Sequence, residues 1–148
     1  MRKIILTFAG LLFTVSVFSQ AYWSLTGNAG TTTSNFVGTT DTVPLIFKVN
    51  NEWAGYSGYS DNYNVSFGYR TFNPLNLGES NVALGTQALR TNTTGSGNVA
   101  IGRWANEYNL TGSHNVTIGF GTSALQHDTV SYTVAIGALA LENNKKKW

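Results

Sequence analysis

The residues most able to do chemistry in this 148-residue chain gather late in the sequence, between positions 119 and 128. The run Gly119-Phe120-Gly121-Thr122-Ser123-Ala124 matches, by letter, the glycine-rich turn that holds a dinucleotide. A working turn of this kind opens a helix inside a βαβ unit, with an acidic residue about 20 positions further on. No such unit is predicted here, so we interpret the match as accidental.

Ser123, His127 and Asp128 carry the residue types of a hydrolytic triad. They belong to one loop, where side chains would not converge as nucleophile, base and orienting acid. His114 and His127 occupy turn positions and are predicted to be solvated, not metal ligands. The chain has no cysteine, which excludes thiol chemistry and disulfides. The sequence therefore predicts no catalytic residue, no metal ligand and no cofactor, as in a protein that is not an enzyme.

A third candidate is a set of aromatic rings that could stack on sugars. Four of them lie close together in the sequence and one lies further along: Trp53, Tyr56, Tyr59, Tyr63 and Trp104. Trp104 is expected to be the better exposed contact. The alternative, which the burial habit of large aromatics favours, is that most of these rings cover the open end of a stacked fold.

A tandem repeat must position these groups. Five segments share the pattern Asn or Thr, Val, a small residue, a large apolar residue and Gly: residues 64–68, 81–85, 98–102, 115–119 and 133–137. The glycines recur at steps of 17, 17, 17 and 18 residues. The structural positions of the repeat are Asn64, Gly68, Asn81, Gly85, Asn98, Gly102, Asn115, Gly119 and Gly137. A fixed period of this length predicts a solenoid.

Alternation within each repeat decides which side chains share a face. Val99 and Ile101 point to one side of a strand and Ala100 to the other. We predict that the large residues face the inside of the coil and that the small residues form a flat outer face. The small column is Ser66, Ala83, Ala100, Thr117 and Ala135. The repeat glycines are predicted to take positive φ at the corners, and asparagine near a corner tolerates the same region.

Secondary features keep the same period. Ala88-Leu89 begins three residues after its glycine and predicts a second short strand that returns across the coil. In the fourth repeat, Phe120-Gly121 is expected to push Ala124-Leu125 two places along, which would lengthen the last step. Glycosylation sequons also begin at Asn92, Asn109 and Asn115, and we attribute them to the repeat's own use of Asn and Thr.

A single coil is not expected to fold alone. Burying its valine, isoleucine and leucine yields roughly 1.5–3 kcal/mol for each side chain, whereas ordering each backbone residue costs about 1–2 kcal/mol. Coils must therefore stack and share backbone hydrogen bonds. Because even the stack is thin, association with further copies of the chain is expected.

Composition and charge agree with this picture. Charged residues make up only 11% of the chain and glycine accounts for 16 residues, a mix that suits short strands joined by tight turns. The net charge of +2 comes from the two ends, because residues 20–144 carry four basic residues against seven acidic ones. That slightly acidic body offers no basic patch for a phosphate backbone, so nucleic acid is not an expected partner.

The N-terminal residues indicate export. Arg2 and Lys3 give a basic start, and residues 4–18 are almost continuously apolar. We predict a signal peptide over residues 1–19 and a mature chain that begins at Gln20 and is extracellular or at the cell surface. The apolar stretch falls short of the about 20 residues that span a bilayer, and no later segment could cross one.

The repeat, with Asn-Val-Ala-Ile-Gly at residues 98–102 and Asn-Thr-Thr-Gly at 92–95, resembles the head repeats of trimeric autotransporter adhesins. It resembles more closely the collar repeats of bacterial and phage tail-fibre-like proteins that end in an endosialidase-type intramolecular chaperone. Residues 23–51 are similar to the N-terminal part of secreted fibre proteins of that group. The resemblance implies a left-handed parallel β-roll, three chains side by side, and display at a surface for attachment. With no such chaperone before Trp148, we expect a truncated member.

We therefore predict an all-β parallel β-solenoid, or β-roll, of about five 17-residue coils that acts as a homotrimer. The domains are a signal peptide (1–19), an N-terminal β cap (20–63) with a strand at 44–50, the repeats (64–144) and a basic tail (145–148). The predicted function is a non-catalytic, exported, adhesive fibre module whose partner is a surface glycan or a cell-surface receptor. Two alternatives stay open: a carbohydrate-binding module that uses the aromatic rings, and a left-handed β-helix acyltransferase. The latter is disfavoured because its coils repeat aliphatic residues at every sixth position, and here Arg103, Trp104 and Ala105 follow Ile101.

Overall fold

The computed structural model describes residues 27, 29–58, 62–72, 77–123 and 129–142. The predicted signal peptide and basic tail, and Tyr59, lie outside the described residues. The chain divides into two compact units, Met1–Val37 and Gly38–Trp148. In the first unit, the Thr32 N–H donates to Oδ1 of Asn35 (2.6 Å), which closes a local turn.

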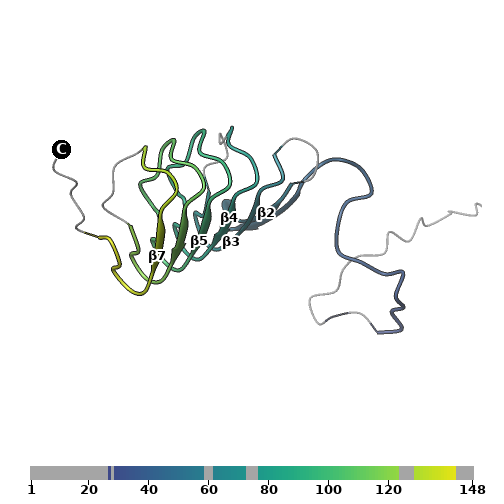
Figure 1. Ribbon diagram of the computed structural model, residues 1–148. Helices are drawn as coiled ribbons and strands as arrows, with labels where there is room; N and C mark the ends of the chain where they lie inside the picture. Colours follow the sequence, from purple (N-terminus) through teal and green to yellow (C-terminus); the bar gives the residue numbers. More distant parts are fainter. Residues whose placement is uncertain (1–26, 28, 59–61, 73–76, 124–128, 143–148) are drawn as a thin grey trace, which may run out of the picture. The chain divides into compact units, whose positions relative to one another are not determined.

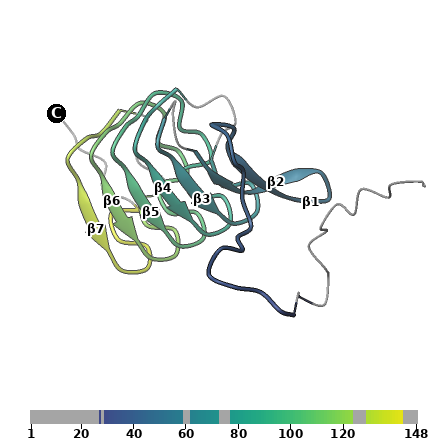
Figure 2. The same cartoon turned by 90° about the vertical axis from the view of Figure 1, so that its right-hand side faces the viewer.

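Every strand of the described residues lies in the second unit, in one sheet whose spatial order is the chain order. The strands are β1 (Leu45–Val49), β2 (Glu52–Ser57), β3 (Val65–Phe67), β4 (Val82–Leu84), β5 (Val99–Ile101), β6 (Val116–Ile118) and β7 (Val134–Ile136). From β3 to β7 neighbouring strands are parallel and pair at equivalent repeat positions, so that Val82 lies opposite Val99. Figures 1 and 2 show these strands stacked as one side of successive coils. The predicted all-β solenoid is confirmed, with five stacked strands and about four full turns; its left-handed sense stays a prediction.

A hairpin covers the N-terminal end of this stack. Strands β1 and β2 are antiparallel, and β2 pairs antiparallel with β3, the strand of the first coil. The rings of Phe47 and Phe67 pack edge to face over Gly55, with centroids 5.8 Å apart. A Cβ on Gly55 would lie 2.9 Å from the Phe47 ring, so only glycine allows this contact. The strand predicted at residues 44–50 is confirmed as β1.

The predicted orientation of the two faces is wrong. The small column lies inside the coil, where Ala83 and Ala100 are fully buried and Ser66, Thr117 and Ala135 are nearly so. The valines and the large apolar residues point outward and are partly or largely exposed. A period of two determines that the side chains alternate, but it does not say which face lies inside. The coil interior is so narrow that only small side chains fit behind the strand.

The hydrophobic core is correspondingly small. It consists of five fully buried side chains, with Phe72 packed against them: Ala83, Ala88, Leu89, Ala100 and Ala105. The segment around Ala88-Leu89 is a turn and not the second strand that we predicted. Gln87 and Leu89 have positive φ of 61° and 49°, which curls the chain. The Gln87 N–H bonds to the preceding coil and the Leu89 N–H to the following one, at 3.0 and 3.1 Å.

The position of the extra residue in the fourth repeat also differs from expectation. The backbone N–H of Leu89 donates to Ala105 O (3.1 Å), and the equivalent bond one coil later joins Asn106 N–H to Thr122 O (2.9 Å). Thr122 and Ser123 are buried and take the positions of Ala105 and Asn106. The extra residue therefore follows Ser123 instead of preceding it. Ala124-Leu125, which we expected at these positions, lies outside the described residues.

We predict that Gly102→Ala destabilises the solenoid more than Gly137→Ala. Both glycines have positive φ, at 126° and 121°, which costs any other residue about 1–3 kcal/mol. At Gly102 an added Cβ would also lie 2.7 Å from the Gly119 carbonyl carbon in the next coil, whereas at Gly137 nothing lies within 4 Å. Chemical denaturation should show a difference of about 1–3 kcal/mol between the variants, as for overpacking elsewhere. Equal losses would contradict this contact between coils.

Candidate functional site

The outward side chains of β3 to β7 form one apolar surface, which we call the aliphatic face. It has two columns: Val65, Val82, Val99, Val116 and Val134 in the first, and Phe67, Leu84, Ile101, Ile118 and Ile136 in the second. The parallel register places equivalent residues directly above one another. No charged or polar side chain interrupts either column.

Exposure along the aliphatic face is greatest at its two ends. Phe67 on β3 is 61% exposed, and Val134 and Ile136 on β7 are 68% and 66% exposed. On β5 and β6 the same positions are half-buried because each side chain has a neighbour on both adjoining strands. Singly exposed apolar residues are ordinary, but a contiguous apolar surface commonly marks an interaction site. This face is the feature of the described residues best suited to binding a partner.

A ladder of asparagines holds the strands behind this face. The backbone N–H of Asn98 donates to Oδ1 of Asn81 (2.9 Å), and its Nδ2 donates to the same oxygen (3.0 Å) and to Gly112 O (2.8 Å). The pattern recurs between Asn81 and Asn64, and the N–H of Asn115 continues it by donating to Asn98 Oδ1 (3.0 Å). All four asparagines are buried. The side-chain amides of Asn81 and Asn98 therefore each link three successive coils.

A second ladder runs along the opposite part of the coil. The Asn109 Nδ2 donates to Asn92 Oδ1 (2.7 Å) and to Gly112 O (2.9 Å). The Gly112 carbonyl thus accepts from both ladders and joins them across the interior. Asn92, Asn109 and Asn115, the sequon asparagines, are all buried in these bonds, so the folded protein does not present them for glycosylation.

The repeat glycines have the predicted positive φ, whereas the repeat asparagines, which would tolerate it, do not adopt it. In every repeat the positive φ falls one residue earlier, at Tyr63, Ser80, Gly97, His114 and Tyr132. The chain turns at that residue, which leaves the asparagine side chain directed inward along the stack. Reading the asparagines as corner residues therefore missed their role. The signal that could have revealed it was an amide side chain invariant in four repeats next to a column of only small residues.

Three of the predicted glycan contacts lie at the capped end of the solenoid. Trp53 and Tyr56 on β2 are half-buried, with ring centroids 6.1 Å apart and planes inclined at 44°. The Tyr56 hydroxyl donates to Oδ1 of Asn62 (3.1 Å). Tyr63 precedes β3 and is 60% exposed. Tyr59 lies outside the described residues, so the structure does not place it with the others.

Cations flank the rings at this end. The Lys48 Nζ lies 5.9 Å from the centroid of the Trp53 ring, and the Arg70 guanidinium lies 5.3 Å from that of Tyr69. Arg70 donates a hydrogen bond to Glu52 (3.4 Å), which raises the pKa of Arg70. The arginine therefore stays charged at any physiological pH.

Trp104 lies apart from this group, on the third coil, and the expectation that it is the better exposed contact is wrong. Its ring is half-buried because Arg103 stacks on it at 3.8 Å and Phe120 packs against it with centroids 5.2 Å apart. Its Nε1 donates to Oε1 of Gln87 one coil earlier (2.7 Å). The ring is thus engaged by neighbouring coils and is less open than that of Tyr63.

The remaining chemical candidates are not brought together. Ser123 is buried in the fourth coil, and His127 and Asp128 lie outside the described residues. His114 is exposed and stacks on Tyr132, with ring centroids 5.1 Å apart. Within the described ranges, three or more His, Asp or Glu side chains nowhere gather as they would to hold a metal ion. The described part of the chain also has no helix with the length and hydropathy to span a bilayer.

Comparisons with protein-family models, with curated proteins and with solved structures found no match to this chain. The fold therefore rests on the structure itself, and the resemblance to fibre and adhesin repeats rests on the repeat residues alone.

We predict that Asn98→Ala destabilises the solenoid by about 3 kcal/mol or more. The change removes the amide that bonds Asn81 and Gly112 and leaves the buried Asn115 N–H without its acceptor, at about 1–3 kcal/mol for each unpaired group. Thr133→Ala is the matched control, because Thr133 occupies the same repeat position and its backbone N–H keeps its bond to Asn115 Oδ1 (2.9 Å). Denaturation curves of both variants check the prediction, and similar losses would show that the ladder contributes little.

Proposed function

We propose that this protein is a non-catalytic, exported fibre module that associates side by side with copies of itself through the aliphatic face and serves attachment at a surface. The single observation that supports association is the pair of outward apolar columns on β3 to β7. Burial of apolar surface is the main driving force of protein association, and these side chains form two unbroken apolar columns. Export and attachment rest on the predicted leader and on the resemblance of the repeats.

A second copy of the chain is the partner that fits this face best. The columns repeat once per coil, at the step by which the strands stack. A partner surface can match the columns along all five strands only if its own contact residues recur with the same spacing from coil to coil. Another copy of the chain has this spacing necessarily. Three copies can close a ring in which each chain turns its aliphatic face toward a common axis. The number three comes from the resemblance to trimeric fibre repeats.

We predict that the purified chain scatters light as a trimer and that Ile101→Glu makes it monomeric or strongly weakens the assembly. Ile101 lies in the middle of the aliphatic face, where a carboxylate would be buried without a partner at the interface. Thr94→Glu is the control, because Thr94 is exposed on a turn outside that face. Light scattering coupled to size exclusion measures the mass, and circular dichroism shows whether each variant is folded. A folded wild-type monomer would contradict the proposal, and so would an equal loss of the assembly in both variants.

Carbohydrate binding is a second candidate function, favoured by the paired rings of Trp53 and Tyr56 at the capped end and by the 60% exposure of Tyr63, which precedes β3. We predict that any glycan bound by the wild-type chain is lost in the double variant Trp53→Ala/Tyr63→Ala. The control is Tyr132→Ala, which removes an exposed ring before the last strand. A glycan array measures binding for all three chains. No signal from the wild type, or undiminished binding by the double variant, would remove this candidate.

A further inference from the structure

The interior of the solenoid changes character between its second and fourth coils. The position four residues after each repeat glycine faces the core and is occupied in turn by Phe72, Leu89, Asn106, Ser123 and Leu141. In the second coil Leu89 fills this position and is fully buried. In the third and fourth coils two polar side chains take its place. The apolar core is therefore interrupted there by polar groups.

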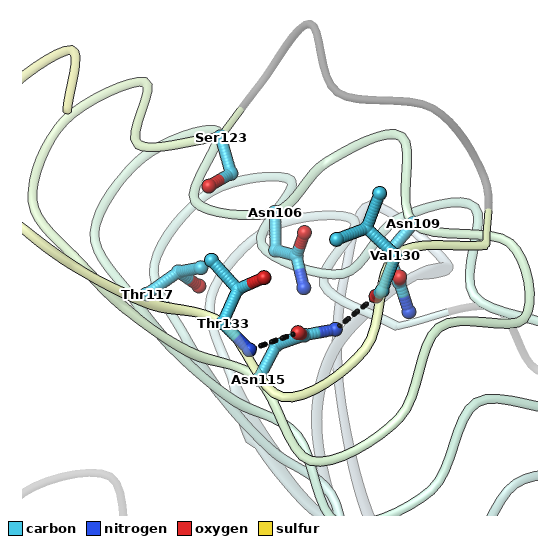
Figure 3. Close-up of a pocket in the computed structure, with 7 residues that line it drawn as sticks. All are labelled: Asn106, Asn109, Asn115, Thr117, Ser123, Val130 and Thr133. Carbon is cyan, nitrogen blue, oxygen red and sulfur yellow. Dashed lines mark hydrogen bonds between the residues drawn. The ribbon is translucent and has the colours of Figure 1, made fainter. Parts of the chain in front are cut away.

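A small cavity lies at this interruption. Its volume is about 10 Å³, and it is lined by Asn106, Asn109, Asn115, Thr117, Ser123, Val130 and Thr133. These residues come from the third, fourth and fifth coils, and Figure 3 shows their side chains around one common space. Six of the seven side chains are polar. Polar side chains thus gather around this cavity, in a fold whose interior is otherwise made of small apolar side chains and amide ladders.

Two of the lining groups have no hydrogen-bond partner in the protein. Asn106 and Ser123 are only 6% and 3% exposed, yet Nδ2 of Asn106 and Oγ of Ser123 are both unpaired. These two atoms are the only buried side-chain nitrogen or oxygen atoms among the described residues that lack a partner. Leaving such a group dry costs about 1–3 kcal/mol. Two buried polar groups without hydrogen bonds in one cavity would lower the stability of so thin a fold considerably.

Two other lining side chains, Asn115 and Thr117, are already hydrogen-bonded elsewhere. The Asn115 Oδ1 accepts from the Thr133 N–H (2.9 Å), and its Nδ2 donates to Val130 O (2.7 Å), as the dashed lines in Figure 3 mark. The Thr117 hydroxyl donates to Val99 O (3.2 Å), which leaves its oxygen able to accept. The Asn115 amide therefore cannot turn toward Asn106 or Ser123 without breaking its own bonds. Neither unpaired atom has a partner in the protein, and a separate molecule can supply it.

We propose that this cavity binds one ordered water molecule, which accepts a hydrogen bond from Nδ2 of Asn106 and exchanges one with Oγ of Ser123. The volume matches a single water, and the two unpaired groups supply the minimum number of partners that a buried water needs. The lining holds no carboxylate, so it is not built for a cation. The water fills, in the third and fourth coils, the space that Leu89 occupies in the second.

The first test observes the water in the unmodified protein. In the purified wild-type chain, water-selective NMR should show a cross-peak between water and the side-chain amide protons of Asn106. Its sign should be that of a water that stays bound longer than the protein takes to tumble. A folded wild-type chain without this cross-peak overturns the proposal.

The second test uses the sign of a stability change. If water bonds the Ser123 hydroxyl, Ser123→Ala removes one of its partners and lowers the denaturant midpoint. If the cavity is dry, the same variant removes an unpaired buried hydroxyl and raises the midpoint. A raised midpoint therefore overturns the proposal, and so does an unchanged one.

Asn106→Leu copies the residue of the second coil and should abolish the NMR cross-peak between water and the Ser123 backbone amide. If that cross-peak survives in the variant, Asn106 does not hold the water, which overturns the proposal.

Discussion

Everything in this fold depends on hydrogen bonds that run along the stacking axis between equivalent residues of successive coils. No coil is wide enough to contain a core of its own, so its backbone and its buried amides find their partners one step above and one step below. The asparagine ladder makes this dependence strict. Asn98 is bonded to Asn81 on one side and to Asn115 on the other, and all three are buried away from water. A register slip by one residue would leave each of these amides unpaired in the interior.

The same constraint explains why the large apolar residues are outside. The interior behind each strand is occupied by the ladder amides, by a column of small residues and, in the second coil, by Leu89. Valine and isoleucine have no room there, and the strand's alternation sends them to the other face. The aliphatic face is thus a consequence of the narrow coil. A thin solenoid of this design leaves part of its hydrophobic surface exposed, which connects the fold to the proposed function.

The fourth coil shows how much irregularity the design tolerates. It is one residue longer than the others, and the extra residue is absorbed after Ser123, away from the strand and the ladder. The bond from Thr133 N–H to Asn115 Oδ1 keeps the length and direction of the earlier rungs. The polar residues that enter the core beside this insertion do not break the stack. They replace an apolar contact with a site that a single water can complete.

The sequence by itself determined the solenoid, its period, the repeat strands β3 to β7 and the capping strand β1, because each depends on local alternation or on repetition, which are visible in the letters. The sequence could not say which face of the strand is inside, since Val99 and Ala100 alternate equally well in either orientation. Nor could it show that Asn98 is a buried rung, that Ala88-Leu89 is a turn, or that Thr122 and Ser123 take the positions expected for Ala124-Leu125. Only the tertiary structure decided these points, because each depends on the width of the coil and on partners 17 or 18 residues away.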